Sequence, residues 1–359
     1  MNYAGRLRRL CEQLGHDRYD AVLVSSPANI RYLTGYAGSN ALVVAGPGGA
    51  TLLTDFRYLQ AVAPMREFME VRQVQQELLP PAAQLLAEML PAGGRGAFEA
   101  QHLSQAAYTV LAEHVGGGHL VSAHGLVEQL RMVKEAEELD AIRQAAALLE
   151  HVYAALAEQG LSGRREVDVA WRVRELLHEM GAEPAFETIV ASGEAGAMPH
   201  AVPREHVIDS ATLVTIDAGA RLHGYCSDCT RSFATAPLPP ALAEIYQVCL
   251  AAQLTGVEAV REGAVSGDVD AAVRAVIAGA GYGEQFQHGT GHGVGLEIHE
   301  APRLARDQTA TLAAGMVVTV EPGIYLPELG GVRIEDLLIV TAEGAERLTG
   351  YPKELITSG

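Results

Sequence analysis

The chain has 359 residues, which is enough for two or three domains. Its content of 48% hydrophobic and 19% charged residues is typical of a globular protein and argues against disorder. A formal net charge of −18 argues against nucleic acid and anionic membranes as partners, because both bind basic patches. The N-terminus lacks the apolar core of a signal peptide, and no run approaches the ~18 apolar residues of a spanning helix. We therefore expect a cytoplasmic protein with free thiols.

Residues 1–126 alternate between apolar runs and amphipathic segments, which indicates a small α/β domain with a central sheet. Three apolar runs predict buried strands, namely AVLVSS (21–26), ALVVAG (41–46) and ATLLTD (50–55). Two segments predict helices, namely PPAAQLLAEML (80–90) and HLSQAAYTVLAEHV (102–115).

Residues 127–359 show longer helices followed by pairs of strands. The helical pattern of 126–160 is interrupted near Lys134 and Glu135 and ends at Gly160. The later expected elements are, in chain order, a helix at 165–180, strands at 212–217 and 225–235, helices at 239–261 and 267–280, and strands at 316–325 and 331–340. Helices followed by a strand pair occur twice in this order, which indicates an internal duplication of an α+β half.

Each expected strand pair carries two acidic residues among apolar neighbours. They are Asp217 and Asp228 in the first half, and Glu321 and Glu335 in the second. A buried carboxylate is costly without a counter-charge, and four such residues outnumber the nearby cations. Bound metal would resolve this imbalance. We expect Asp336, which points away from its neighbour Glu335, to be solvated.

Each of these acids also has an ordinary structural explanation. Asp217 precedes Ala-Gly-Ala and suits a turn, and Asp228 suits the solvent face of an edge strand. Glu321 precedes a proline and suits a strand end. Glu335 suits an ion pair with Arg333, because residues two apart share a strand face. The joint pattern of two acids on each of two strand pairs nevertheless favours a metal site.

The glycine-rich stretch QHGTGHGVGLEIHE (287–300) offers three imidazoles to such a site, from His288, His292 and His299. Oxygen-rich ligands with a single imidazole favour Mn²⁺, with Co²⁺ and Zn²⁺ as alternatives. Four carboxylates and one histidine suit two ions ~3.5–4 Å apart.

Three other motifs were sought, and none of them supports a different chemistry. Cys226 and Cys229 form C-x-x-C, but they lie in an expected strand, and Cys11 and Cys249 do not complete a zinc site. GTGHGVG fails the G-x-G-x-x-G pattern of nucleotide loops, and no H-E-x-x-H is present. We expect these cysteines to be structural.

The order and contexts of Asp217, Asp228, His292, Glu321 and Glu335 resemble the pita-bread metallopeptidases, which include methionine aminopeptidase, aminopeptidase P and prolidase. SSPANIRYLTGYAGSN and LLTDFRYLQA resemble the creatinase-type N-terminal domain of Xaa-Pro peptidases. The resemblance implies an α+β protein, with a smaller N-terminal α/β domain at 1–126 and a pita-bread catalytic domain at 127–359. It also implies two divalent ions per chain. Asp217 would bind one, His292 and Glu321 the other, and Asp228 and Glu335 both.

The resemblance also implies roles for residues outside the ligand set. His200, in AMPHAVP, would contact the substrate near the attacked carbonyl. His288 and His299 would line the substrate site and stabilise the tetrahedral intermediate. Arg333 would lie behind the bridging Glu335. Glu321, besides binding metal, would take the proton of the attacking water and pass it to the leaving nitrogen.

The implied activity is hydrolysis of the Xaa-Pro bond in short proline-containing peptides by a homodimer. The compact chain favours an Xaa-Pro dipeptidase (prolidase), and an Xaa-Pro aminopeptidase (aminopeptidase P) is the alternative. The family's dipeptidases often read the product-side carboxylate through a partner's N-terminal domain, and the sequence does not identify such a group here. Two further hypotheses are an inactive relative that serves as a binding module and a metal-free, creatinase-like hydrolase of a small amidine. The former usually loses ligands, and the latter does not need all five.

Overall fold

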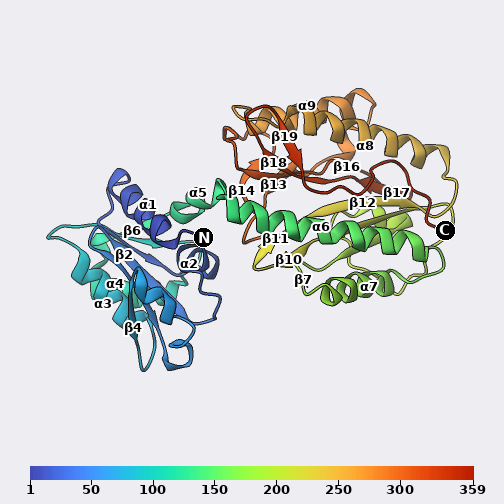
Figure 1. The fold of residues 1–359 in the computed structure, drawn as a ribbon. Coiled ribbons are helices and arrows are strands. Elements are labelled where there is room, and N and C mark those ends of the chain that lie inside the picture. Colours follow the sequence, from blue (N-terminus) through green and yellow to red (C-terminus); the bar gives the residue numbers. More distant parts are fainter. The chain divides into compact units, whose positions relative to one another are not determined.

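The computed structural model describes residues 1–359, and the chain divides into two compact units, Met1–Arg131 and Met132–Gly359. Each unit combines helices with strands, as the expected α+β class requires (Figure 1). None of the helices has both the length and the apolar character that crossing a bilayer demands.

The first unit is built on one sheet of six strands in the order β4-β3-β2-β1-β5-β6. Strand β1 pairs antiparallel with β2 and parallel with β5, so the sheet is mixed. The first three strands confirm the predicted ones. The six strands are β1 (Ala21–Val24), β2 (Ala41–Gly46), β3 (Gly49–Thr54), β4 (Glu70–Gln73), β5 (Gly96–Glu99) and β6 (Leu120–Ala123).

Four helices accompany this sheet, and the sequence predicted the last two of them. They are α1 (Tyr3–His16), α2 (Pro27–Thr34), α3 (Leu79–Met89) and α4 (Gln105–Val115). Helix α2 has clear start and stop signals in the sequence. Ser26 caps its N-terminus, Pro27 occupies the first turn, and Gly35 ends it with a φ of 78°.

The helices of the second unit occur close to the predicted places. They are α6 (Ala136–Gln159), α7 (Glu166–Glu179), α8 (Pro240–Ala259) and α9 (Ser266–Gly279), and α6 follows a short α5 (Leu126–Met132). The predicted interruption between α5 and α6 is a capping box, in which the main-chain N–H of Glu135 donates to Glu138 Oε2 at 2.9 Å. Gly160 follows α6 as predicted.

The strands of the second unit form two principal sheets, in the orders β12-β9-β8 and β14-β13-β15-β18-β19. Two smaller sheets, β11-β10-β7 and β16-β17, complete the unit. The strands are β7 (Glu183–Pro184), β8 (Ile189–Ser192), β9 (Leu213–Ala218), β10 (Ala220–Leu222), β11 (Tyr225–Cys226), β12 (Cys229–Ala234), β13 (Gly291–Gly293), β14 (Glu300–Leu304), β15 (Val317–Val320), β16 (Gly323–Leu326), β17 (Gly330–Arg333), β18 (Asp336–Val340) and β19 (Ala345–Arg347).

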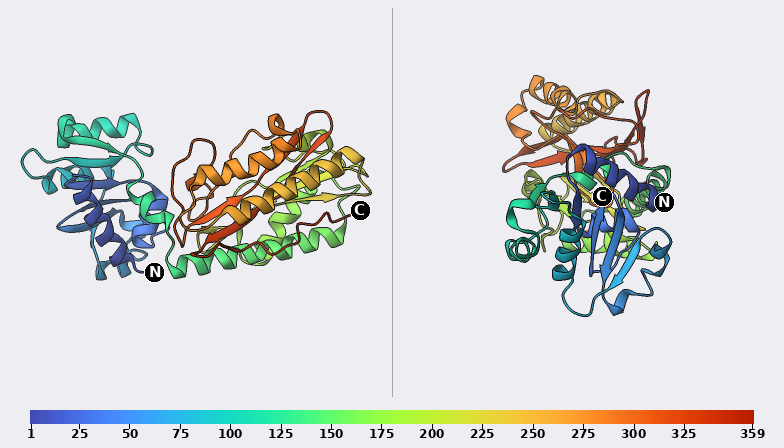
Figure 2. Two further views of the ribbon diagram at one scale, coloured as in Figure 1. Left: turned by 90° about the horizontal axis from the view of Figure 1, so that it is seen from above. Right: turned by 90° about the vertical axis from the view of Figure 1, so that its left-hand side faces the viewer.

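The second unit contains the same arrangement of two helices and three strands twice. In the first half β9 pairs antiparallel with β8 and β12, and in the second half β15 pairs antiparallel with β13 and β18. Helices α6 and α7 (green) and helices α8 and α9 (gold to orange) lie on opposite sides of these strands (Figure 1, Figure 2). The repeated order in the sequence therefore corresponds to a repeated fold.

Three predicted strands are interrupted where the sequence predicted an acidic residue within a strand. Asp228 lies between β11 and β12, Glu321 between β15 and β16, and Glu335 between β17 and β18, whereas Asp217 lies within β9. At the last break, the main-chain N–H of Glu335 leaves the sheet ladder and donates to the carbonyl of Thr230 at 3.1 Å. Such a bond to another strand gives the backbone N–H a partner at the break. The acidic side chain there need not follow the alternating side-chain directions of a regular strand.

Asp336 is not solvated as predicted, because its side chain is 0% exposed. Its Oδ1 accepts hydrogen bonds from Arg231 Nη2 (2.9 Å) and Thr349 Oγ1 (2.9 Å). Its Oδ2 accepts from Lys353 Nζ (2.6 Å) and Gln253 Nε2 (3.0 Å). Burial alone would raise the pKa of Asp336, but the charges of Arg231 and Lys353 hold it below its usual value. The prediction was wrong because these partners all lie outside the strand itself, from 13 residues (Thr349) to 105 residues (Arg231) away in sequence.

Replacing Asp336 with Ala should destabilise the second unit strongly, because Arg231 and Lys353 would be left buried without their counter-charge. Removal of one partner from a buried ion pair costs about 3–5 kcal/mol of unfolding free energy. The matched control is Asp140→Ala, which removes an exposed pair with Arg143 and should have no measurable effect. Urea unfolding of both variants measures the difference. Equal midpoints for the two would contradict the structural role of Asp336.

Candidate metal centre

The five predicted metal ligands all lie in the second unit and come from both of its halves. The first half contributes Asp217 on β9 and Asp228 just before β12. The second half contributes His292 on β13, Glu321 after β15 and Glu335 before β18. The pairing of β9 with β12, and of β15 with β13 and β18, brings these predicted ligands, which are spread from Asp217 to Glu335 in sequence, to one place.

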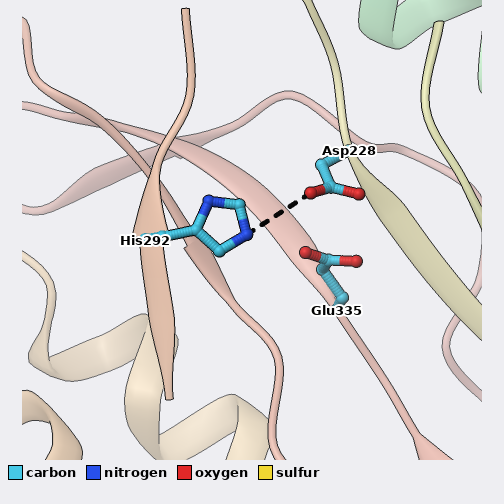
Figure 3. Close-up of side chains that lie close together, drawn as sticks. All are labelled: Asp228, His292 and Glu335. Atoms are coloured by element: carbon cyan, nitrogen blue, oxygen red, sulfur yellow. Dashed lines mark ion pairs between the residues drawn. The ribbon is translucent and has the colours of Figure 1, made fainter. Parts of the chain in front are cut away.

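Three of the five predicted ligands form a compact group. One ligand atom each of Asp228, His292 and Glu335 lies within 4.8 Å of the others (Figure 3). His292 Nε2 is 3.5 Å from Asp228 Oδ2 and 3.3 Å from Glu321 Oε1, so Glu321 lies at the same imidazole. Asp217 is linked to the group through Arg333, whose Nη2 donates to Asp217 Oδ2 at 2.7 Å.

The orientation of His292 is fixed by the main chain around it. Its Nδ1 lies 3.0 Å from the carbonyl of Gly293, which is suited to a proton on Nδ1 and a lone pair on Nε2. The N–H of His292 donates to Thr319 Oγ1 at 3.1 Å, and Thr319 in turn donates to Glu321 Oε1 at 3.2 Å. The lone pair of Nε2 therefore points towards the oxygens of Asp228 and Glu321, an arrangement that suits a cation between them.

Glycines on both sides of His292 let β13 approach its neighbours closely. A side chain at Gly291 would overlap the carbonyl of Thr319, and one at Gly293 would overlap the carbonyl of Ala301. These glycines serve backbone packing, as the absence of a nucleotide-loop motif in the sequence suggested.

The carboxylates carry more negative charge than the protein around them neutralises. Burial raises the pKa of Glu321 to about 8. Burial and the neighbouring carboxylates raise the pKa of Asp228 and of Glu335 well above the usual range. Three buried oxygens, Asp217 Oδ1, Asp228 Oδ1 and Glu335 Oε1, accept no hydrogen bond from the protein. Such a group of unpaired acceptors suits a bound cation.

Arg333 is the buried cation nearest to this group, with only 4% of its side chain exposed. Besides Asp217, its Nη1 donates to the carbonyl of Pro199 and to Tyr325 Oη, both at 3.1 Å. Its Nε donates to Thr230 Oγ1 at 3.2 Å, and Thr230 donates to Glu335 Oε2 at 2.8 Å. The alternative pairing of Arg333 with Glu335 is therefore not what the structure shows. Arg333 pairs with Asp217 and reaches Glu335 only through Thr230.

The histidines predicted outside the ligand set lie near it in different environments. His288 Nε2 is 2.8 Å from Tyr325 Oη, and the ring of His299 meets that of His292 edge-on with centroids 4.4 Å apart. His200 lies in an exposed loop after η4 (Gly193–Ala197). Burial lowers the pKa of His288 to about 4 and also lowers that of His299, and the charge of His200 contributes to both shifts.

Sequence reasoning missed Tyr325 and Thr230, which connect the predicted residues. Tyr325 links Arg333 to His288, and Thr230 links Arg333 to Glu335. Tyr325 was visible only as the end of an expected strand, MVVTVEPGIY, and Thr230 only as the residue two positions after Asp228. Tyr and Thr are both common in strands, so neither residue gave a sign in the sequence of a role at the site.

The cysteines of C-x-x-C are free and buried, as the structural interpretation of this motif predicted. The thiols of Cys226, Cys229 and Cys249 lie 3.9, 3.7 and 3.2 Å from the carbonyls of Leu296, Glu335 and Pro322. Burial raises the pKa of the Cys226 thiol to about 11. These thiols pack beneath the backbone of the site and are unsuited to ligation or redox chemistry.

The chain is similar to known proteins along almost its whole length. Residues 140–342 match metallopeptidase family M24, and residues 6–133 match the creatinase/prolidase N-terminal domain. An Xaa-Pro dipeptidase of Pyrococcus furiosus is 34% identical over 98% of this chain and 99% of its own. An Xaa-Pro dipeptidase structure from Bacillus anthracis superimposes with a TM-score of 0.95, at 36% identity over 99% of this chain and 100% of its own. An X-Pro aminopeptidase structure from Thermotoga maritima gives 0.85, at 29% identity over 98% and 99%. The chain therefore belongs to metallopeptidase family M24.

Proposed function

We propose that this protein is a divalent-metal-dependent Xaa-Pro dipeptidase. The observation that carries the proposal is the group of four carboxylates and one imidazole, with three buried oxygens that no protein donor satisfies. An inactive binding module of this fold would not need to maintain that electrostatic cost. A metal-free hydrolase would not need it either.

The residues present fit two divalent ions. Four carboxylates with one imidazole form an oxygen-rich donor set that suits Mn²⁺, with Co²⁺ and Zn²⁺ as alternatives. In our assignment Asp217 would hold one ion, and His292 and Glu321 the other. Asp228 and Glu335, each with one buried oxygen that has no hydrogen-bond partner, would hold both.

When bound, the ions would supply Lewis-acid chemistry that activates water and polarises the scissile carbonyl. We assign to Glu321 the transfer of the water proton to the leaving nitrogen. In the metal-free protein burial raises the pKa of this carboxyl to about 8, and bound cations would lower it again. The neutral imidazoles of His288 and His299, together with His200, are assigned to the substrate carbonyl and the developing oxyanion. Arg333 holds Asp217 in place.

The preference for proline follows from its missing N–H and its fixed φ. A protease that grips the N–H of the leaving residue cannot bind an Xaa-Pro bond. An active site that binds the free α-amine and accepts the pyrrolidine ring can cleave it. The dipeptidase assignment is supported by the relatives of that name, and the aminopeptidase alternative by the relative from Thermotoga maritima.

Mn²⁺ as the physiological ion, a homodimer and a cytoplasmic location complete the proposal. The ligand chemistry supports Mn²⁺, and the family resemblance supports the homodimer. Four free cysteines, three of them buried, suit a reducing compartment. Light scattering of the purified protein tests the dimer, since a monomer at micromolar concentration would contradict it.

Replacing His292 with Ala should abolish hydrolysis of an Xaa-Pro dipeptide and weaken the binding of one Mn²⁺ ion, because the imidazole is the only nitrogen ligand of the set. We expect a loss of at least about 100-fold in kcat/KM. Steady-state kinetics and calorimetric titration with Mn²⁺ measure the two effects. The control is Cys226→Ser, which changes a buried thiol outside the ligand set and should leave both nearly unchanged. Activity of His292→Ala within a few-fold of wild type would overturn the ligand assignment.

An Xaa-Pro dipeptide should be cleaved more efficiently than the matched Xaa-Pro-Yaa tripeptide. A dipeptidase recognises the free carboxylate of proline, and a charged hydrogen bond of this kind corresponds to at least about tenfold in kcat/KM. Comparing the two peptides under identical metal loading measures the ratio. Equal or better cleavage of the tripeptide would transfer the assignment to aminopeptidase P.

The metal-free protein should lose stability as pH rises. The folded pKa values of Asp228, Glu321 and Glu335 lie above those of the unfolded chain, so the folded state binds more protons. Stability should therefore fall between the ordinary carboxyl pKa of 4.5 and about 8, the raised pKa of Glu321. Mn²⁺ should restore stability, because it replaces the protons. Melting temperatures with EDTA or Mn²⁺, measured across this range, test the sign.

Glu335→Gln provides the variant for this measurement. Its amide removes one titrating group, so the melting temperature of the metal-free protein should fall less steeply with pH than that of wild type. The same variant should lose stabilisation by Mn²⁺. A steeper fall, or an unchanged response to Mn²⁺, would contradict the electrostatic account of the site.

A further inference from the structure

Two non-ligand histidines of the proposed site lie on loops next to equivalent strands of the two halves. His200 lies after β8, in the segment 193–203, and His288 lies before β13, in the segment 286–290. Each loop is closed by a pair formed by a buried carboxylate and an arginine that belongs to neither the ligand set nor the substrate-facing set.

In the second half the pair is Asp270 and Arg274, one turn apart on α9. Arg274 Nε and Nη2 donate to the carboxylate of Asp270 at 2.6 and 3.1 Å. Asp270 Oδ1 accepts from the N–H (3.1 Å) and the hydroxyl (2.8 Å) of Thr290, at the end of the loop. Arg274 Nη1 donates to the carbonyl of Phe286 at 2.9 Å, at its start, and Nη2 donates to the carbonyl of His288. The loop is therefore held at both ends and at the histidine itself.

In the first half the pair is Glu166, the first residue of α7, and Arg204. Glu166 has no exposed side-chain surface. Its carboxylate accepts from the N–H (2.9 Å) and the hydroxyl (2.7 Å) of Ser192, just before the loop. It also accepts from Arg204 through the main-chain N–H (2.9 Å), Nε (2.9 Å) and Nη2 (2.7 Å), just after the loop. Arg204 Nη2 returns to the carbonyl of Ser192 at 3.2 Å, which closes the base of the loop.

We propose that Glu166–Arg204 and Asp270–Arg274 are positioning pairs, which hold His200 and His288 in the places where they act on the substrate. This inference rests on the proposed function. The pairs share a design that general stability does not require, because each bonds both ends of one histidine loop. Two-pronged arginine–carboxylate bonds fix both distance and direction, and a catalytic group displaced by about 1 Å can lose 100-fold in rate.

The test uses Arg204→Met and Arg274→Met in the full-length protein, with hydrogen–deuterium exchange measured without metal. Arg204→Met should increase exchange in residues 193–203 and leave 286–290 unchanged, and Arg274→Met should do the reverse. Each variant is thus the control for the other. Arg172→Met is a further control, because Arg172 pairs only with the exposed Glu175 and Glu179 on α7 and should affect neither loop. Unchanged exchange in the matching loop would overturn the proposal.

Kinetics distinguish a positioning role from general destabilisation. Each Met variant should lower kcat for an Xaa-Pro dipeptide by about 10–100-fold with less than about threefold change in KM. When His288 is already Ala, Arg274→Met should not lower kcat any further, because the positioned imidazole is gone. The same should hold for Arg204→Met when His200 is already Ala. Additive losses would overturn the proposal.

A second pair of variants covers the case in which a Met variant does not fold. Arg204→Lys and Arg274→Lys keep the charge but lose the two-pronged geometry, so they should give the same loop-specific exchange with smaller kinetic losses. If both Lys variants matched the wild type in loop exchange and in kcat, the proposal would also be overturned. A wild-type protein that hydrolyses no Xaa-Pro dipeptide would refute the proposed function alone, and the exchange result would still decide whether the pairs hold the loops.

Discussion

The repulsion among four carboxylates around one imidazole is the constraint on which the rest of the second unit depends. Arg333 is the one buried cation in contact with them, and it pairs directly only with Asp217. Asp228 and Glu335 keep oxygens without any donor, so the protein maintains a deficit of positive charge that bound ions can fill. The fold supplies the stability that tolerates this cost, from the apolar packing of helices against two sheets and from ion pairs placed just behind the site.

The adjacent residues Glu335 and Asp336 show how that cost is confined. Both are buried and lie side by side in sequence, but they project in opposite directions from the backbone. Arg231 and Lys353 neutralise Asp336 and lower its pKa, whereas Glu335 has a raised pKa and an unsatisfied oxygen. Arg231 also donates to the carbonyl of Glu335, so the satisfied pair anchors the backbone of the residue with the unsatisfied oxygen. A layer of ion pairs therefore supports the layer of unsatisfied carboxylates.

The sequence was sufficient to predict the order of elements, the repeat and the acids that the fold brings together, because these depend on local patterns. It was insufficient for the strand breaks. GVRIEDLLIV is a continuous run of strand-forming residues, and only the contact of Glu335 with Thr230 on another strand ends the ladder there. The partners of Asp336 were equally hidden, since Arg231 is about a hundred residues away and nothing in its local context indicates burial. Long-range partners of this kind have no periodicity in sequence from which they can be read.

The duplication explains how one scaffold provides both a symmetric frame and an asymmetric site. Each half gives two carboxylates from equivalent strands, which suits two ions that share bridging ligands. The strands that pair with β9 and β15 on one side, β8 and β13, then diverge. Strand β13 carries His292 towards the carboxylates, whereas β8 ends at Ser192, which Glu166 ties to the base of the His200 loop. A peptide bond has different groups at its two ends, so a fully symmetric site would bind it in two opposed directions. Divergence at β8 and β13 therefore makes the two sides of the site different, while β9 and β15 keep the same antiparallel pairing in both halves.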